Sequence, residues 1–139
     1  MTPRGGPAWI GDTSPTRTEP HGPHATDLLA ANLHGVFGER DPERRRAVVA
    51  ATYTDDVEFA DPEETVVGPD ALEAKAAALL AGAPGFVFAE VGPAYVAGDV
   101  AALAWTFGPA GADPVARGVD VITVRDHRIS AVRTLLAAG

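Results

Sequence analysis

The chain has 139 residues and a mass of 14.3 kDa, which suits one domain and excludes a second full one. Hydrophobic residues make up 46% of it and cysteine is absent, so a folded core is expected while disulfides, thiolate metal sites and a cysteine nucleophile are excluded. Eleven basic residues against nineteen acidic ones give a net charge of −8, which disfavours nucleic acid and anionic membranes as partners.

The first segment, residues 1–25, differs in composition from the rest of the chain. It holds five of the twelve prolines and contains no Leu, Val or Phe, so it cannot bury enough apolar surface to offset the entropy of ordering. It also lacks the continuous apolar run of a signal peptide. We therefore expect a flexible tail over 1–25, a folded domain over 26–139, and a soluble protein in the cytoplasm, where a chain without cysteine fits the reducing conditions.

Helical periodicity dominates the first half of the domain. Apolar residues spaced by three and four predict a helix from Thr26 to about Gly38. Asp41, followed by proline at the first helical position, begins a second helix that runs to about Tyr53. A third helix is predicted after residues 68–70, Gly-Pro-Asp, with Gly82 as its stop signal.

The second half changes to alternation with a period of two and to β-branched residues, which predicts strands. A short strand is also expected before the third helix, at about Val57 to Asp61. Short turn sequences separate the later strands and cannot hold a parallel crossover, so these strands should form an antiparallel meander. The order of elements predicts an α+β fold with helices against one face of a curved sheet. The later strands are expected at about 86–97, 99–108, 115–125 and 128–137.

Asp61 is the first candidate for chemistry. Six acids crowd the segment 55–64, and alternation along the strand puts Asp61 on the same face as Val57 and Phe59. Asp61 therefore follows the apolar face, whereas most of the other acids should be solvated. The alternative is that Asp61 and Pro62 simply form the turn that ends the strand, as Asp-Pro steps often do.

Asp120 is the second candidate, because it interrupts an otherwise apolar strand. It shares a face with Gly118, Ile122 and Val124, and a carboxylate held among such neighbours loses hydration, which raises its pKa unless a partner compensates. Desolvated carboxylates of this kind often mark functional sites. The alternative is a buried structural aspartate that backbone amides, Arg117 or Arg133 satisfy.

Other polar and aromatic residues carry weaker signals. Trp105 is expected in the core, although its indole N–H needs an acceptor and could face a pocket. Tyr53 at a helix end is similar, and His34 flanks the apolar stripe of the first helix. The histidines do not stand at the spacing of metal ligands, so no metal site is predicted. Phosphate-loop, dinucleotide-binding and nucleophile-elbow motifs are absent.

Several stretches together resemble one superfamily. They are the run from Tyr53 to Pro62 (YTDDVEFADP), Gly68, the run from Gly118 to Val121 (GVDV), and the run from Asp126 to Ile129 (DHRI). With the order of helices and strands over about 26–137, these residues are similar to the NTF2-like superfamily, in its SnoaL-like and ketosteroid-isomerase-like branch. The resemblance implies a cone-shaped, cystatin-like fold in which three N-terminal helices pack on a curved, mainly antiparallel sheet around an apolar pocket.

The resemblance also implies roles for particular residues. Asp61 matches the general base of ketosteroid isomerases, and Asp120 matches the second aspartate, which stays protonated and donates a hydrogen bond to the enolate oxygen. Tyr53 matches the tyrosine at the helix end. The chain departs from the family pattern on the first helix, where the family has its oxyanion tyrosine and this chain has no tyrosine. Losing one such donor typically costs about 3 kcal/mol of transition-state stabilisation, unless His34 or the Trp105 N–H replaces it.

Two functions are therefore expected. The first is an isomerase, cyclase or lyase that needs no cofactor and acts on a small apolar carbonyl compound, with Asp61 and Asp120 as catalytic residues. The second is a module that binds a ligand or dimerises without catalysis, in which Asp120 is structural. An open sheet face rich in Val and Leu favours a homodimer in either case. Besides Tyr53 and His34, the residues expected to contact the ligand are Phe59, Phe86, Phe88, Trp105 and Ile122.

Overall fold

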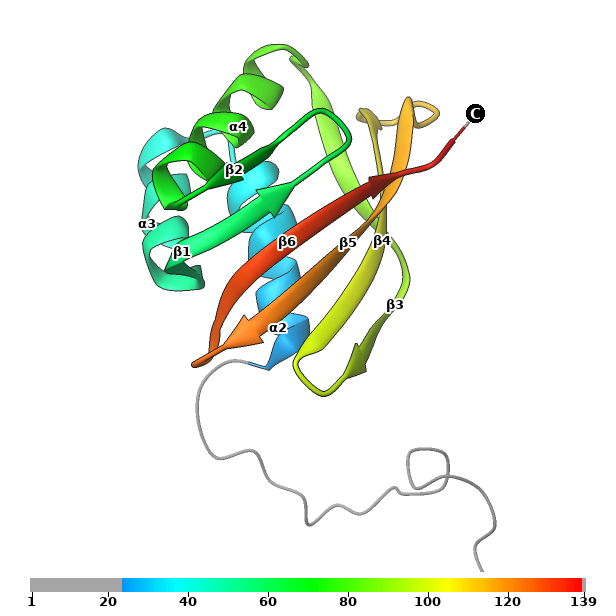
Figure 1. The fold of residues 1–139 in the computed structure, drawn as a ribbon. Coiled ribbons are helices and arrows are strands. Elements are labelled where there is room, and N and C mark those ends of the chain that lie inside the picture. The colour runs from blue at the N-terminus through cyan, green and yellow to red at the C-terminus, as the bar shows by residue number, and fades with distance from the viewer. Residues whose placement is uncertain (1–23, 139) are drawn as a thin grey trace, which may run out of the picture.

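A computed structural model describes residues 24–138 (Figure 1). The predicted tail, 1–25, lies outside these residues except for its last two, and Ala25 already belongs to the first helix. The helices are α2 (Ala25–Ala30), the π-helix η1 (Ala31–Phe37), α3 (Pro42–Thr52) and α4 (Pro69–Ala81). The strands are β1 (Tyr53–Ala60), β2 (Thr65–Val67), β3 (Phe86–Ala97), β4 (Val100–Pro109), β5 (Ala116–Arg125) and β6 (Arg128–Leu136).

The helices begin and end at the predicted signals, with one difference in helical type. The helix expected in one piece from Thr26 to about Gly38 is α2 continued by η1, so its second half is wound as a π-helix. Asp41 caps α3, and its side chain accepts a hydrogen bond from the backbone N–H of Arg44 at 2.8 Å. Among the described residues, no helix has the length and apolar character needed to cross a bilayer.

The six strands form one sheet in the order β2-β1-β6-β5-β4-β3. Strands β3 to β6 are the predicted antiparallel meander. β1 pairs in parallel with β6 and carries β2 on its other side. β1 is longer than expected: it begins at Tyr53, where the helix signal ends, and β2 was not predicted because three residues are too few for a periodic pattern.

The sheet curves around the helices, which lie on its concave side (Figure 1). The curvature has a local cause in β3, where the pairing with β4 shifts between Val91 and Tyr95. Gly92 lies in this irregularity with φ +70°, a conformation that glycine adopts without strain. Phe88, which precedes this irregularity in β3, lines the cavity described below.

The hydrophobic core lies between the helices and the sheet. Its completely buried side chains come from all layers and include Leu29, Leu33, Val57, Leu72, Ile122, Ile129 and Val132. Two arginines tie the helices together. Arg45 is 4% exposed, and its Nε lies 2.8 Å from Glu73 Oε2 on α4. Arg40 donates to the carbonyl of Leu80 in the last turn of α4 and to that of Ala83 just after the helix, at 2.9 and 2.6 Å, where orphaned carbonyls need donors.

Candidate active site

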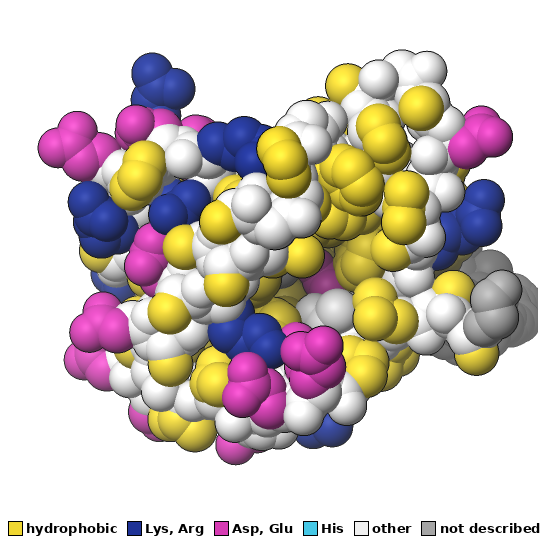
Figure 2. All heavy atoms as spheres, turned by 90° about the horizontal axis from the view of Figure 1, so that it is seen from above, with side chains coloured by type: hydrophobic (Ala, Val, Ile, Leu, Met, Phe, Trp, Pro, Cys, Tyr) yellow, Lys and Arg dark blue, Asp and Glu magenta, His cyan; other side chains and the backbone are white. Residues whose placement is uncertain are grey.

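One large cavity of about 750 Å³ opens between α4, η1 and the sheet. Figure 2 shows it as a hollow with hydrophobic side chains on its walls and charged side chains near its rim. Aromatic walls come from Phe37, Phe59, Phe88, Trp105 and Phe107. The ionisable groups that line it are Asp61, Glu63, Glu64, Lys75 and Asp120. The cavity is large enough for a small organic ligand and offers that ligand mostly apolar contacts.

Asp120 lies deep in this cavity, in the middle of β5, and is 6% exposed. Its Oδ1 accepts hydrogen bonds from the Trp105 indole N–H at 3.0 Å and from the Thr134 hydroxyl at 2.9 Å. Its Oδ2 accepts from the Asn32 side-chain amide at 3.0 Å. The partners are therefore neutral side chains of β4, β6 and η1. The alternative that backbone amides, Arg117 or Arg133 satisfy this carboxylate is corrected.

Burial decides the electrostatics of Asp120. Desolvation raises the pKa of this carboxyl above its ordinary value, while the hydrogen bonds from Trp105, Thr134 and Asn32 lower the pKa and offset only part of the rise. No ion pair with a cationic side chain stabilises the charge among the described residues. Asp120 is thus easier to protonate than a solvated aspartate, as its place in an apolar strand predicts.

Behind Asp120 lies a second polar pair. The Tyr53 hydroxyl, 2% exposed as a residue, donates to Asn32 Oδ1 at 2.6 Å. Asn32 is completely buried, and its Nδ2 donates a second hydrogen bond to Asp120. Burial raises the pKa of Tyr53 well above its ordinary value, and the charge of Asp120 raises it further. Tyr53 is therefore a neutral hydrogen-bond donor at neutral pH.

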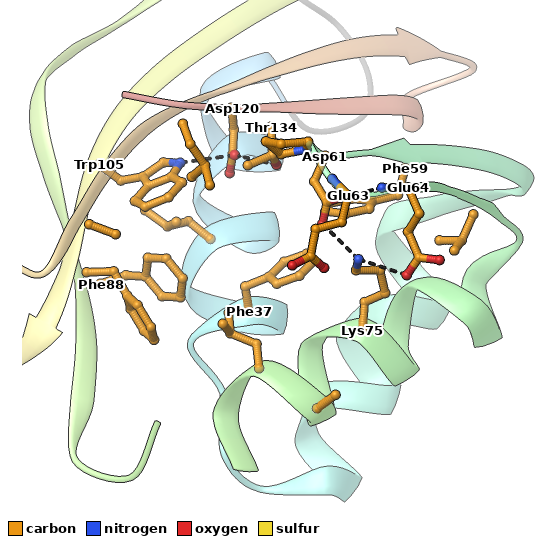
Figure 3. Close-up of a pocket in the computed structure, with 18 of the residues that line it drawn as sticks. Phe37, Phe59, Asp61, Glu63, Glu64, Lys75, Phe88, Trp105, Asp120 and Thr134 are labelled. Atoms are coloured by element: carbon orange, nitrogen blue, oxygen red, sulfur yellow. Dashed lines mark hydrogen bonds and ion pairs between the residues drawn. The ribbon is translucent and has the colours of Figure 1, made fainter. Parts of the chain in front are cut away.

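Asp61 lies at the rim, directly after β1, and fulfils both interpretations of its sequence. As a turn residue, its Oδ1 accepts hydrogen bonds from the backbone N–H groups of Glu63 and Glu64, at 2.9 and 3.0 Å. As a cavity residue, its Oδ2 lies 2.8 Å from Lys75 Nζ on α4. The turn between β1 and β2 therefore holds the carboxylate in place against the cavity (Figure 3).

The surroundings of Asp61 favour its ionised form. Desolvation raises its pKa, but the hydrogen bonds from Lys75 and from the backbone amides of Glu64 and Glu63, with the charge of Lys75, outweigh it, and the pKa is lowered overall. Lys75 also contacts Glu64 at 3.0 Å. Burial lowers the pKa of Lys75, and its two acidic partners reverse this and raise it. The two aspartates of the cavity thus have pKa values shifted in opposite directions.

The structure brings some of the predicted ligand contacts together and leaves others outside. Phe59, Phe88 and Trp105 line the cavity beside Asp61 and Asp120. Four residues do not line this cavity, and their contact with a ligand stays a prediction. Ile122 is fully buried in the core, Tyr53 is buried behind Asn32, Phe86 packs edge-on against Phe107, and His34 points outward to Glu90, with Nε2 2.8 Å from Oε2.

The two donors expected to replace the missing tyrosine of the first helix, His34 and the Trp105 N–H, both have other partners. His34 is too far out to serve, because its side chain is 46% exposed on the outer face of η1. The Trp105 N–H is inside the cavity but is bound to Asp120. Sequence reasoning missed Asn32, Thr134 and Lys75. A polar residue within the apolar stripe of the first helix was the available signal for Asn32, whereas Thr134 and Lys75 carry no signal in a single sequence.

Metal ligation has little support in this arrangement. Within residues 24–138, no group of three or more His, Asp or Glu side chains gathers as metal ligands do. Asp61 and Glu64 at the rim instead form ion pairs with Lys75. The polar groups of the site are therefore suited to hydrogen bonding and proton transfer, chemistry that needs only side chains.

The curved sheet and the helices around an apolar cavity form an NTF2-like fold. Within this class, the SnoaL-like domain family matches residues 31–132, and the chain belongs to that family. The match covers η1 to β5 in full and β6 as far as residue 132. No curated protein matches the sequence.

Solved structures agree with this assignment. A proposed isomerase of the SnoaL-like family from Agrobacterium tumefaciens is 26% identical, with a TM-score of 0.75 over 81% of this chain and 96% of that one. A proposed SnoaL-like polyketide cyclase from a Jannaschia species is 19% identical, with a TM-score of 0.64 over 78% of this chain and 81% of that one. A proposed ketosteroid isomerase from Kribbella flavida, 18% identical, has a TM-score of 0.58 over 82% and 81%. The last two show a common fold.

Proposed function

We propose that this protein binds a small apolar carbonyl compound and catalyses proton transfer next to the carbonyl, as an isomerase, cyclase or lyase. The observation that carries the proposal is that two carboxylates line one cavity with oppositely shifted pKa values. A pair of titratable groups whose environments separate their pKa values is the usual arrangement for an acid and a base in one site. The similar structures include a proposed isomerase and a proposed polyketide cyclase.

In this proposal Asp61 is the general base. It is ionised at neutral pH, lies at the rim of the cavity, and can take the proton from the carbon next to the carbonyl. Protonation of Asp61 breaks its ion pair with Lys75, so this base is weak and the C–H bond must be activated. Activation comes from the other end of the cavity, where neutral Asp120 donates a hydrogen bond to the developing enolate oxygen.

Replacing Asp61 by asparagine tests the base. We expect Asp61→Asn to abolish exchange of the α-protons of a β,γ-unsaturated cyclic ketone with D2O, followed by proton NMR, while the far-UV circular dichroism stays unchanged. Glu58→Gln is the matched control, because Glu58 is an exposed acid on the other face of β1 and should exchange like the wild type. Undiminished exchange by Asp61→Asn would eliminate Asp61 as the base.

A second candidate, a binding module without catalysis, is favoured by one specific observation. Asp120 already has three hydrogen bonds from protein donors, and no buried side-chain polar atom of the described residues lacks a partner. A structural carboxylate would look the same. Titration of Asp120 by carbon-13 NMR separates the candidates: a pKa at or below the ordinary range supports the module, and a raised pKa supports the acid of the enzyme.

Self-association through the open sheet is part of the proposal. Apolar side chains on the edge strand β3 are unusually exposed for large hydrophobics, with Val87 at 49%, Val91 at 49% and Tyr95 at 66%. Such patches on a soluble chain often mark an interface, and a homodimer is the commonest assembly. Sedimentation velocity tests this: Val91→Glu should convert a dimer to a monomer, and a wild type that sediments as a monomer would exclude the dimer.

A further inference from the structure

Asn32 has no part in the proposed proton transfer, yet among residues 24–138 it is the most completely buried polar residue. It belongs to η1, and π-helical turns of this kind often occur at functional sites. Its amide lies between two groups far away in the sequence, Tyr53 and Asp120, and it is 0% exposed. An apolar side chain would fill such a position without the cost of desolvating an amide. The hydrogen bond to Asp120 is therefore the place to look for the reason why an amide is buried here.

The hydrogen-bond chemistry of the three groups fixes the direction of the chain. A carboxylate only accepts, a tyrosine hydroxyl has one proton to donate, and an amide has a donor end and an acceptor end of nearly equal shape. The Tyr53 hydroxyl donates its proton to Asn32 Oδ1, with an oxygen–oxygen distance of 2.6 Å. The NH2 group of Asn32 therefore faces Asp120, with Nδ2 3.0 Å from Oδ2. In the opposite orientation the amide oxygen would face the carboxylate. That orientation is favourable only when Asp120 carries a proton on Oδ2.

We infer that Asn32 is a positioning residue for Asp120 and that Tyr53 locks its amide in the orientation that donates to the carboxylate. Asn32 thus holds Oδ2 in place, whereas Trp105 and Thr134 hold Oδ1. Removing the Tyr53 hydroxyl frees the amide to turn and accept the proton of neutral Asp120. The role of this lock in turnover rests on the proposed function, but the lock itself does not, and it can be measured without a substrate.

The other groups that face Asp120 do not supply this effect. β4, β6 and η1 present the neutral side chains of Trp105, Thr134 and Asn32, and the charge on η1, if His34 is protonated, is directed outward to Glu90. Tyr53 on β1 is a titratable group that reaches Asp120 through Asn32. The remaining ionisable groups lie at other points of the same cavity lining: Asp61, Glu63, Glu64 and Lys75.

The test is a double-mutant cycle read by carbon-13 NMR titration of Asp120 in the full chain. Tyr53→Phe alone should raise the midpoint of the Asp120 titration, and Asn32→Leu should raise it by about one pH unit, the value of one lost hydrogen bond to a charged group. In the Asn32→Leu background Tyr53→Phe should have no further effect. Thr134→Val is the matched control: it also removes a neutral donor, but the Tyr53→Phe effect should persist in full in its background.

Two results would overturn the inference. An equal effect of Tyr53→Phe with and without Asn32 would mean that Tyr53 acts on Asp120 directly. Should Asn32→Leu not fold, the side-chain amide signals of Asn32 in the wild type, followed by nitrogen-15 NMR, decide instead. They should move with the Asp120 titration and lose that dependence in Asp120→Asn, and signals that ignore the titration would refute the lock. The proposed function fails separately, by undiminished proton exchange in Asp61→Asn.

Discussion

Gly118 on β5 has no room for a side chain, because Trp105 packs directly over it. A Cβ at this position would lie 2.5 Å from the Leu135 carbonyl oxygen and 2.5 Å from Trp105 Cζ2. Both distances are too short for a real contact, so in Gly118→Ala the paired backbone at Leu135 and the Trp105 indole must both shift. Overpacking of this kind costs about 1–3 kcal/mol. Displacing the indole also loses its hydrogen bond to Asp120, which adds about 1.5–3 kcal/mol.

We therefore expect Gly118→Ala to lower the free energy of unfolding by about 2.5–6 kcal/mol. Urea unfolding followed by far-UV circular dichroism measures this. The fluorescence of Trp105, recorded in a Trp9→Phe background, should shift as the indole leaves its site. Gly82→Ala is the control, because a Cβ there meets its nearest atom at an ordinary 3.5 Å. A Gly118→Ala protein with wild-type stability and unchanged fluorescence would refute this account of the packing.

Three further outcomes follow from the charged groups. The pKa of Asp61 is lowered in the folded state, so ionised Asp61 stabilises the fold above the ordinary pKa of 3.8, and this stabilisation is lost as the pH falls through the folded-state pKa. Lys75→Met should therefore lower the free energy of unfolding by about 1 kcal/mol near pH 6 and by less near pH 3, as measured by urea unfolding. Arg45→Met should cost about 3 kcal/mol, since it leaves Glu73 unpaired, and adding Glu73→Leu should recover part of that loss; no recovery would contradict a paired role. Carboxylate analogues of a bound ketone should bind at least tenfold more weakly by calorimetry, because four acids and one lysine line the cavity.

The fold was accessible from the sequence because its local signals agree with one another. The caps before α3 and α4 and the short turns between β3, β4, β5 and β6 each have a local physical cause. The parallel pairing of β1 with β6 has none, because it joins segments about 75 residues apart through their backbones. The π-helical winding of η1 is likewise set by what its side chains meet in the folded protein.

In the candidate site, too, some residues could be predicted from the sequence and others could not. Alternation along a strand was enough to select Asp61 and Asp120 from nineteen acids, and both line the cavity. Their partners were not accessible, because Lys75, Asn32 and Thr134 reach them from separate elements. Alternation also assigned Ile122 to the ligand, since a periodic pattern gives the face of a strand but not whether that face meets core or cavity.

The position of β6 in the sheet has a consequence for the order in which the protein assembles during synthesis. β6 follows every other strand in the sequence, yet it lies between β1 and β5. A nascent chain that ends at Arg125 therefore carries two separate pieces of sheet, β2 with β1 and β5 with β4 and β3. Asp61 is on one piece and Asp120 on the other. The sheet that carries both carboxylates is therefore continuous only after β6 has emerged and paired with β1 and β5.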